Sequence, residues 1–423
     1  MYGKNEGIFT LELFESKKEI FIFSLLMIVI FSFNLYQKYN QFLEIKTSKF
    51  YNTDAKILKQ YQKISKTGKT YHVLKIKSDD GYSFFTTNYG DLKDINGREI
   101  SIGFITDKID FRSFLSGFYA PSYDIRLHEY RESFRDKINS YITNQHENPK
   151  MKELFSALFL AEPISKDLRE DVSYLGISHL IAISGFHLGV LFGILFFLFR
   201  YIYIYFQNLY FPYRNIKFDL TILILALLFA YMALIGFVPS VVRAFVMMAF
   251  GFFLFHRSFK IISFEVLFVT ILFILAILPN FLFSIGFWFS ISGVFYIYLF
   301  LKHFSHLKNW QIFLLLNFWV YIAMIPVVHY IFTTFSLHQL FSPFLTMAFS
   351  IFYPLEMFLH AVGLGDLLDS FILKLFSGKD EVYELKTPLW FLLIYLFASI
   401  VCIFQKSFIY VILGMNFLFL TYV

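Results

Sequence analysis

The sequence predicts a polytopic α-helical membrane protein of about ten transmembrane helices that also carries one small β-barrel domain. The first observation is composition, because 57% of the 423 residues are hydrophobic and only 16% are charged, whereas about a quarter of the residues in soluble domains are charged. The second is a succession of apolar runs near spanning length. The third is a polar, strand-like stretch near the N-terminus. The single cysteine, Cys402, excludes an internal disulfide.

Residues 1–45 are predicted to be a polar cytoplasmic segment followed by a membrane anchor. The apolar run from 20 to 36 follows Lys17 and Lys18. A basic flank before a short apolar core is also typical of a signal peptide, but the polar residues at 37–41 offer no small-residue cleavage site. We therefore expect an uncleaved anchor.

Residues 46–118 are predicted to form a periplasmic OB-like domain. Alternating apolar and polar residues at 71–77 and 82–87 predict strands, and turn signals at 66–69, 78–81 and 96–97 separate them. Several short strands in so short a stretch favour a small barrel, and an OB-fold fits the size.

The first half of this domain is strongly basic, with nine lysines and one acid, Asp54, between positions 46 and 77. A solvated surface is one interpretation of such a run. The other is an electrostatic funnel for a polyanion, with Tyr51, Tyr61, Tyr71 and Tyr82 available to stack on bases. The candidate residues for binding a nucleic acid are Lys56, Lys59, Lys63, Lys66, Lys69, Tyr71, Lys75 and Lys77.

Residues 119–175 are predicted to be an amphipathic helical linker. Apolar side chains recur at spacings of three and four between 121 and 145, which suits a helix on the membrane surface or against the barrel. Residues 149–177, which include Pro149 and Pro163, lead into the next domain.

Residues 176–423 are predicted to be a transmembrane domain, and the stretch from Ser178 to Val190 is its most unusual part. It opens an apolar run to Arg200 that is long enough to cross a bilayer as one helix, yet it carries two histidines and two serines. Such polar groups at membrane depth usually face a bundle interior or an aqueous path. Glycines 185, 189 and 193 leave one face bare, so another helix can approach closely. A tightly packed helix with satisfied histidines explains these residues equally well.

The loops between the later apolar runs alternate between cationic and uncharged. The cationic loops are 200–217, 256–260 and 302–309, and the uncharged ones lie near 238–239, 279–280 and 333–334. The positive-inside rule places the cationic loops in the cytoplasm and the basic domain at 46–118 outside. A short amphipathic run at 366–376 is expected at the interface.

Arg243 lies inside an apolar run, where a lone arginine costs at least ~2.5 kcal/mol on insertion scales. Glu265 and Glu356 are candidate partners, and snorkelling from the helix start near Pro239 is the alternative. The best interpretation of a lone histidine such as His360 is a core residue. No metal site or cofactor is expected, because the histidines lack nearby acids at ligand spacing.

An intramembrane serine protease would need a serine–histidine dyad, for which Ser184 is a candidate. The histidine nearest in sequence, His187, is expected to be badly placed to act as its base.

The run from Gly176 to Gly189 resembles the motif GLSHLLAISGLHVG of the ComEC-type competence proteins nearly residue for residue. The segment 239–244 is similar to the family's PSVLRA, and 286–290 resembles its GFQLSF with Trp288 in place of glutamine. The resemblance covers roughly residues 150–360. The chain is similar to the short members of the family, without the metallo-β-lactamase-like domain that many members carry.

The resemblance implies a bacterial inner-membrane channel that passes single-stranded DNA from periplasm to cytoplasm in natural transformation. It implies no catalytic residue, and it implies a DNA path along His179, Ser184, Gly185, His187, Gly189, Ser240, Arg243, Ser290 and His329. The expected partners are single-stranded DNA, membrane lipid, a separate periplasmic DNA receptor or nuclease, and a cytoplasmic translocase, since no Walker motif is present. The alternatives are a secondary transporter or flippase for an anionic solute and an intramembrane hydrolase.

The predicted topology can be tested by cysteine labelling in intact cells. In a Cys402→Ser background, an impermeant maleimide should label Asp80→Cys from outside but should label Ser305→Cys only after permeabilisation, because the cationic loops are expected inside. The reverse pattern would invert the topology.

Overall fold

The computed structural model describes residues 13–14, 16–65, 68–90, 95, 97–129, 132–256, 263–378 and 381–421. The chain divides into two compact units. The sheet unit comprises Ser16–Lys137 and Leu272–Ser284, and the helical unit comprises Met1–Glu15, Ile138–Ile271 and Ile285–Val423.

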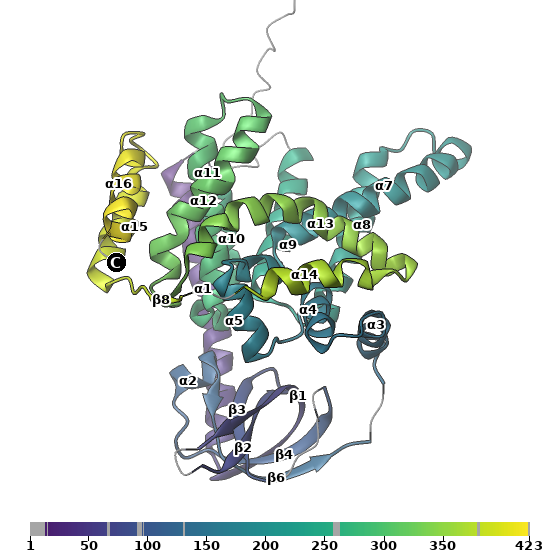
Figure 1. Ribbon diagram of the computed structural model, residues 1–423, viewed down its shortest axis with the longest axis vertical. Coiled ribbons are helices and arrows are strands. Elements are labelled where there is room, and N and C mark those ends of the chain that lie inside the picture. The colour runs from purple at the N-terminus through teal and green to yellow at the C-terminus, as the bar shows by residue number, and fades with distance from the viewer. Residues whose placement is uncertain are drawn as a thin grey trace, which may run out of the picture. The chain divides into compact units, whose positions relative to one another are not determined.

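The sheet unit is built on one six-stranded sheet in the order β5-β3-β2-β1-β4-β6 (Figure 1). The pairs β1–β2, β1–β4, β2–β3 and β4–β6 are antiparallel, and β3–β5 is parallel. The strands are β1 (Phe50–Ile64), β2 (Thr70–Ser78), β3 (Ser83–Asn88), β4 (Glu99–Ile105), β5 (Phe118–Tyr119) and β6 (Ser122–Leu127). The strands predicted at 71–77 and 82–87 are therefore confirmed as β2 and β3.

The core of this unit lies on one face of the sheet and is covered by helices. Ile57, Ile76 and Phe84 are fully buried there. The helix α1 (Lys17–Lys46) runs well beyond the predicted apolar stretch and adds Phe42 and Ile45 from its last turns to this core. The short helix α2 (Phe111–Ser116) and the 3-10 turn η1 (Pro279–Phe283) complete the unit.

The strand pairings of this domain do not close the sheet into the predicted barrel. Among the described residues no strand pairing joins the two ends of the sheet, β5 and β6. Because β5 is only two residues long, it pairs with β3 only at Phe84 and Phe85. An OB-like barrel stays a prediction.

The helical unit contains most of the helices of the chain, joined by short turns (Figure 1). Its first half holds α4 (Pro149–Leu160), α5 (Lys166–Tyr174), α6 (Ser178–Ile181), α7 (Gly185–Tyr210), α8 (Ile216–Leu234) and α9 (Pro239–His256). Its second half holds α11 (Ile285–Phe304), α12 (Asn309–Val328), β7 (Thr334–Phe335), η2 (Leu337–Phe341), α13 (Ser342–Val362), η3 (Gly365–Leu368), α14 (Asp369–Phe376), β8 (Tyr383–Glu384), α15 (Leu389–Val401) and α16 (Phe408–Thr421). Two helices, α3 (Phe134–Thr143) and α10 (Phe264–Ile277), each contribute residues to both units.

Six helices are long and apolar enough to cross a membrane by length and composition, so this is a multi-pass membrane protein. They are Lys17–Lys46, Gly185–Tyr210, Ile216–Leu234, Ile285–Phe304, Asn309–Val328 and Leu337–Val362. Four further apolar helices, within α9, α10, α15 and α16, are shorter. The total of ten spans stays a prediction.

Two predicted helices differ from the structure. The run from 176 to 200 is not one helix, because residues 182–184 are extended and a new helix begins at Gly185. The helix predicted from 121 begins only at Phe134, since residues 122–127 form the edge strand β6. Alternation of Tyr123, Ile125 and Leu127 with polar residues is a strand pattern that the three-and-four spacing concealed.

Candidate functional site

The lysines predicted to bind a polyanion lie mostly on one face of the sheet. In β2, Lys75 and Lys77 point to the face opposite the core, and their partners in β1 are Lys59 and Lys56. An odd spacing in a regular strand puts two side chains on opposite faces. The register shift between Ile57 and Lys59 cancels this effect, so Lys56 and Lys59 share a face.

Aromatic rings are interleaved with these ammonium groups. The ring of Tyr61 lies 5.9 Å from Nζ of Lys59 and 5.7 Å from Nζ of Lys63, and Nζ of Lys75 lies 5.8 Å from the ring of Phe85. Lys63 is opposite Tyr71 in the ladder. We call this surface the lysine face and define it by Lys56, Lys59, Tyr61, Lys63, Tyr71, Lys75, Lys77 and Phe85.

The lysine face places like charges opposite each other on neighbouring strands. Lys56 lies directly opposite Lys77, and Lys59 opposite Lys75, and like charges in such positions destabilise a sheet. Glu99 lies on the other side of Lys56 and offsets part of this charge. Burial lowers the pKa of Lys75, because the charged form loses hydration. A bound anion would stabilise this surface.

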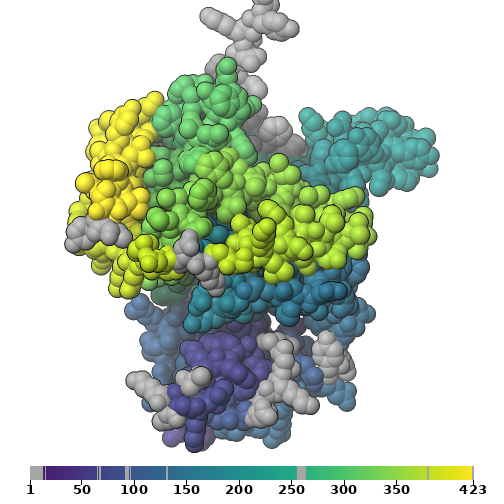
Figure 2. All heavy atoms as spheres, in the orientation of Figure 1, coloured from purple at the N-terminus to yellow at the C-terminus, as the bar shows by residue number. Residues whose placement is uncertain are grey.

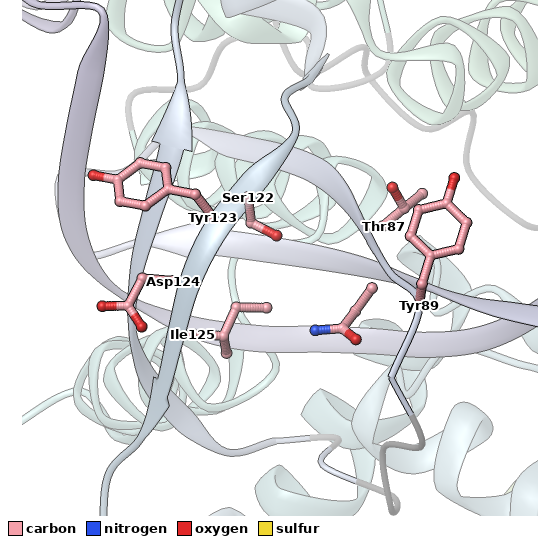
Figure 3. A pocket seen from close by; sticks show the side chains of 7 residues that line it. Thr87, Tyr89, Ser122, Tyr123, Asp124 and Ile125 are labelled. Carbon is pink, nitrogen blue, oxygen red and sulfur yellow. The ribbon is translucent and has the colours of Figure 1, made fainter.

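A hollow of about 240 Å³ lies between the free end of β3 and the edge strand β6. Figure 3 shows Thr87 and Tyr89 on one side of it and Ser122 to Ile125 on the other. Tyr89 is 72% exposed and its ring centroid lies 5.6 Å from that of Tyr71, so the hollow adjoins the lysine face. One lining residue, Asp124, is an acid that pairs with Arg126 at 3.0 Å.

Several residues predicted for this surface lie elsewhere. Tyr82 is 1% exposed and Tyr51 packs against Phe104, so neither ring is available for stacking. Lys69 is exposed in the turn before β2, and Lys66 lies outside the described residues. The rings that do lie on this side of the sheet include Phe85 and Tyr89, which alternation along β3 could have indicated.

In the helical unit, the central motif forms a joint between α6 and α7. Residues 182–184 are extended, and Ser184 is the N-cap of α7, where it forms a capping box with His187. Nδ1 of His187 accepts a hydrogen bond from the Ser184 backbone N–H at 3.1 Å. The hydroxyl of Ser240, at the start of α9, donates to the Ile183 carbonyl at 2.5 Å. We call residues 182–187 the α6–α7 joint.

Close contact between α7 and α9 depends on Gly185. A Cβ atom built at Gly185 would lie 3.3 Å from Cβ of Ala244 and 3.4 Å from an Arg243 guanidinium nitrogen. At Gly189 and Gly193 such an atom would meet nothing within 4 Å. The close approach predicted from the three glycines is therefore seen at Gly185.

Arg243 is buried, with 6% of its surface exposed, and it forms no ion pair with a carboxylate among the described residues. Its Nε donates to Ser290 Oγ on α11 at 2.7 Å, and a terminal nitrogen lies 3.1 Å from the sulfur of Met247. The two acids considered as partners are engaged elsewhere. Glu265 accepts from the backbone N–H of Leu13, and Glu356 lies beside His360.

We expected His187 to be badly placed to act as a base for Ser184. The distance contradicts this, because Ser184 Oγ lies 3.1 Å from His187 Nδ1. The reason is that Ser184 precedes the helix as its N-cap, which brings the third helical residue back to it. The same Nδ1 already accepts the Ser184 N–H. Nε2 of His187 has no hydrogen-bond partner in the described part of the chain.

The structure therefore gathers six of the predicted path residues around this joint: Ser184, Gly185, His187, Ser240, Arg243 and Ser290. It places the others differently. His179 contacts Thr346 of α13 at 3.1 Å, and His329 is the C-cap of α12, where its Nδ1 contacts the Phe332 carbonyl. Gly189 is exposed one turn beyond the joint.

A family model described as Competence protein matches residues 161–420. That range contains the α6–α7 joint and excludes the six-stranded sheet. No curated protein matches the chain, and no solved structure matches it.

The packing at the joint predicts that replacing glycine by leucine will destabilise the protein at position 185 but not at position 189. Gly185→Leu should destabilise the protein by about 1–3 kcal/mol, because the larger side chain must displace Ala244 or Arg243. Gly189→Leu, the matched control, should leave stability nearly unchanged. Thermal unfolding in detergent measures both, and equal shifts in the two variants would contradict the close contact.

Proposed function

The chain belongs to the competence protein family, and on that premise we propose that it is an inner-membrane channel that passes single-stranded DNA from periplasm to cytoplasm during natural transformation. The family supports a role in DNA uptake in general. The observation that carries the finer proposal is the lysine face, where like-charged pairs and aromatic rings alternate on one surface.

The lysine face suits a single strand better than a duplex. Phosphates along the backbone would neutralise the opposed lysines, and the release of their counterions would make binding salt-dependent. Unstacked bases expose their planes, which can stack on rings such as Tyr71 and Tyr89 irrespective of sequence. We assign this surface to the periplasm, in an OB-like domain that collects the strand.

The α6–α7 joint is the proposed polar lining of the path through the helical unit. An apolar bundle rarely holds an arginine without a carboxylate unless it meets an aqueous route or an anionic ligand. Arg243 has its guanidinium beside Gly185 and Ser290, and no carboxylate in the described part of the chain forms an ion pair with it. A strand passing this point would offer phosphates to Arg243.

The driving force and the processing of the DNA are assigned to separate proteins. No Walker motif is present in the sequence, so we propose a cytoplasmic translocase that pulls the strand. A periplasmic DNA receptor or nuclease would deliver it.

A second candidate is a transporter or flippase for an anionic solute. The buried Arg243 favours it, because an arginine with no carboxylate partner among the described residues suits a small anion as well as a phosphate of DNA. The lysine face separates the two candidates, since a small solute has no need of an extended row of cations and rings.

We expect the full-length protein in detergent to bind labelled single-stranded DNA weakly, without sequence preference, and less tightly as salt increases. A plot of log affinity against log salt has a negative slope. Replacing Lys59 and Lys75 together by Ala should make this slope less steep by about 1.4, because each lost single-strand phosphate contact contributes about 0.7. Fluorescence anisotropy over a salt series gives the slope.

The control for this experiment is Lys166→Ala, which removes an exposed lysine from the helical unit. It should leave the slope unchanged. Binding that ignores salt, or the same change of slope in the control, would refute the assignment of the lysine face.

We also propose that the chain is not an enzyme and should not cleave DNA by itself. Hydrolysis needs metal-bound water or an activated nucleophile. No group of three metal-ligating side chains exists among the described residues, and the His187 Nδ1 that lies 3.1 Å from Ser184 Oγ already accepts the Ser184 backbone N–H. Labelled single- and double-stranded DNA with magnesium, manganese or zinc should stay intact. Cleavage that co-purifies with the protein and is lost in His187→Ala would instead favour the hydrolase.

A further inference from the structure

Two buried histidines from distant parts of the sequence meet inside the helical unit. His146 lies in the turn between α3 and α4, and His360 lies near the end of α13. Their Nε2 atoms are 3.0 Å apart, and the His146 side chain is fully buried. His146 stacks on Phe155 with ring centroids 4.6 Å apart and planes nearly parallel. Neither residue belongs to the α6–α7 joint or the lysine face.

The other nitrogen of each ring faces a hydrogen-bond acceptor. Nδ1 of His146 lies 2.9 Å from both carboxylate oxygens of Asp369 on α14. Nδ1 of His360 lies 2.8 Å from the backbone carbonyl of Glu356. A carbonyl only accepts hydrogen bonds, so Nδ1 of His360 carries a proton, and we assign a proton to Nδ1 of His146 with Asp369 as its carboxylate acceptor.

The protons on the two rings can now be counted. A neutral imidazole carries one proton, so two neutral rings in these orientations would direct two lone pairs at each other across 3.0 Å. A hydrogen bond at this distance requires a third proton. We propose that His146 and His360 share a proton between their Nε2 atoms, which makes the pair a buried proton-binding site of single positive charge.

The surroundings of the pair supply the opposite charge. Asp369 contacts His146 and its side chain is 13% exposed, so one end of the site lies near the surface of the helical unit. Glu356 is completely buried, and neither of its carboxyl oxygens has a hydrogen-bond partner among the described residues. Its Oε2 lies 3.3 Å from Nδ1 of His360. A buried carboxylate without donors is costly unless a cation lies near it, and the shared proton places one there.

The other side chains that face the pair add no further charge. Tyr141 of α3 donates its hydroxyl to the His360 carbonyl at 3.0 Å, and α4 contributes the rings of Phe155 and Phe159. The described titratable groups around the site are therefore Asp369, Glu356 and Tyr141.

The shared proton would link the turn after α3 to the end of α13. Gln145 donates to the His360 carbonyl and accepts from the Gly365 N–H, so the end of α3 is held against the corner between α13 and α14. A Cβ atom at Gly365 would lie 2.8 Å from Nε2 of His360, so glycine is needed for the ring to fit. Both α13 and α14 lie at the surface of the helical unit in Figure 2.

The contact between His146 and His360 should weaken both when the pH falls and when it rises. A fourth proton on the pair would leave two N–H groups facing each other, and loss of the third would leave two lone pairs facing each other. The contact is therefore strongest at intermediate pH and weaker on either side. A pair held by packing alone would show no such maximum.

The test is hydrogen–deuterium exchange of the full-length protein in detergent from about pH 4 to about pH 9, which brackets ordinary histidine titration. After correction for intrinsic exchange rates, protection of peptides from 138–147 and 363–376 should pass through a maximum. On each side it should fall by about tenfold, the size expected for a charge-assisted hydrogen bond.

Two variants and one control separate the shared proton from a structural role. His146→Phe keeps a ring to stack on Phe155 and should abolish the maximum, whereas His306→Phe, at an exposed histidine, should keep it. Asp369→Asn removes the anion beside His146 and should move the alkaline limb of the maximum to lower pH.

Three results would overturn the proposal. The first is protection that changes in one direction only across the pH series, and the second is an unshifted alkaline limb in Asp369→Asn, which also decides the matter if His146→Phe does not fold. The third is one bound zinc or other transition-metal ion per chain in the wild type that disappears in His146→Phe, because a metal would then occupy the gap.

Discussion

The arrangement of the helical unit depends on how the backbone between α6 and α7 satisfies its hydrogen bonds. Inside an apolar bundle an extended segment cannot leave its polar groups unpaired. The Ile183 carbonyl is met by the Ser240 hydroxyl, and the Ser184 N–H by the His187 ring. The first of these bonds ties α9 to the joint, and Gly185 provides the space for that approach. A break in a helix thus positions Arg243.

The surface of the sheet unit likewise depends on one local feature, the register shift in β1. The register shift after Ile57 turns an odd spacing of lysines into a common face, at the cost of placing like charges opposite each other. Like charges directly opposite each other weaken strand pairing, although Glu99 on the other side of Lys56 offsets part of this. An anionic ligand provides a reason for this arrangement, and the rings beside the ammonium groups suit one with exposed bases.

Much of this could be predicted from the sequence because apolar length and charge patterning act locally. The strands at 71–77 and 82–87, the many apolar helices and the amphipathic segment at 366–376 follow from periodicity alone. The break before Gly185 could not be predicted from hydrophobicity, because it depends on the capping of α7 by Ser184 and His187 and on one hydrogen bond from Ser240, far away in sequence. The resemblance placed Arg243 and Ser290 on the same path, but the contact between them could not be predicted, because it joins two helices by tertiary packing.

The site residues divide in the same way. The lysines were predictable as a basic run, but their common face required the register shift, and the burial of Tyr82 required the whole core. His360 was interpreted as a lone core residue. It is buried, yet it meets His146, more than two hundred residues earlier in the chain. Contacts of that sequence separation are set by tertiary packing, which no local pattern encodes.

The central claim is that a single strand of DNA contacts both the lysine face and the α6–α7 joint during uptake. The most direct measurement is site-specific photocrosslinking in competent cells with labelled transforming DNA. The photoreactive amino acid replaces either Tyr89, whose ring lies beside Tyr71 of the lysine face, or Ser184 in the α6–α7 joint. The account predicts that single-stranded DNA is captured at both positions, and that a photoreactive group at the exposed position Phe397 on the apolar helix α15 captures none. Capture of duplex DNA alone, or of no DNA at either position while uptake proceeds, would contradict it.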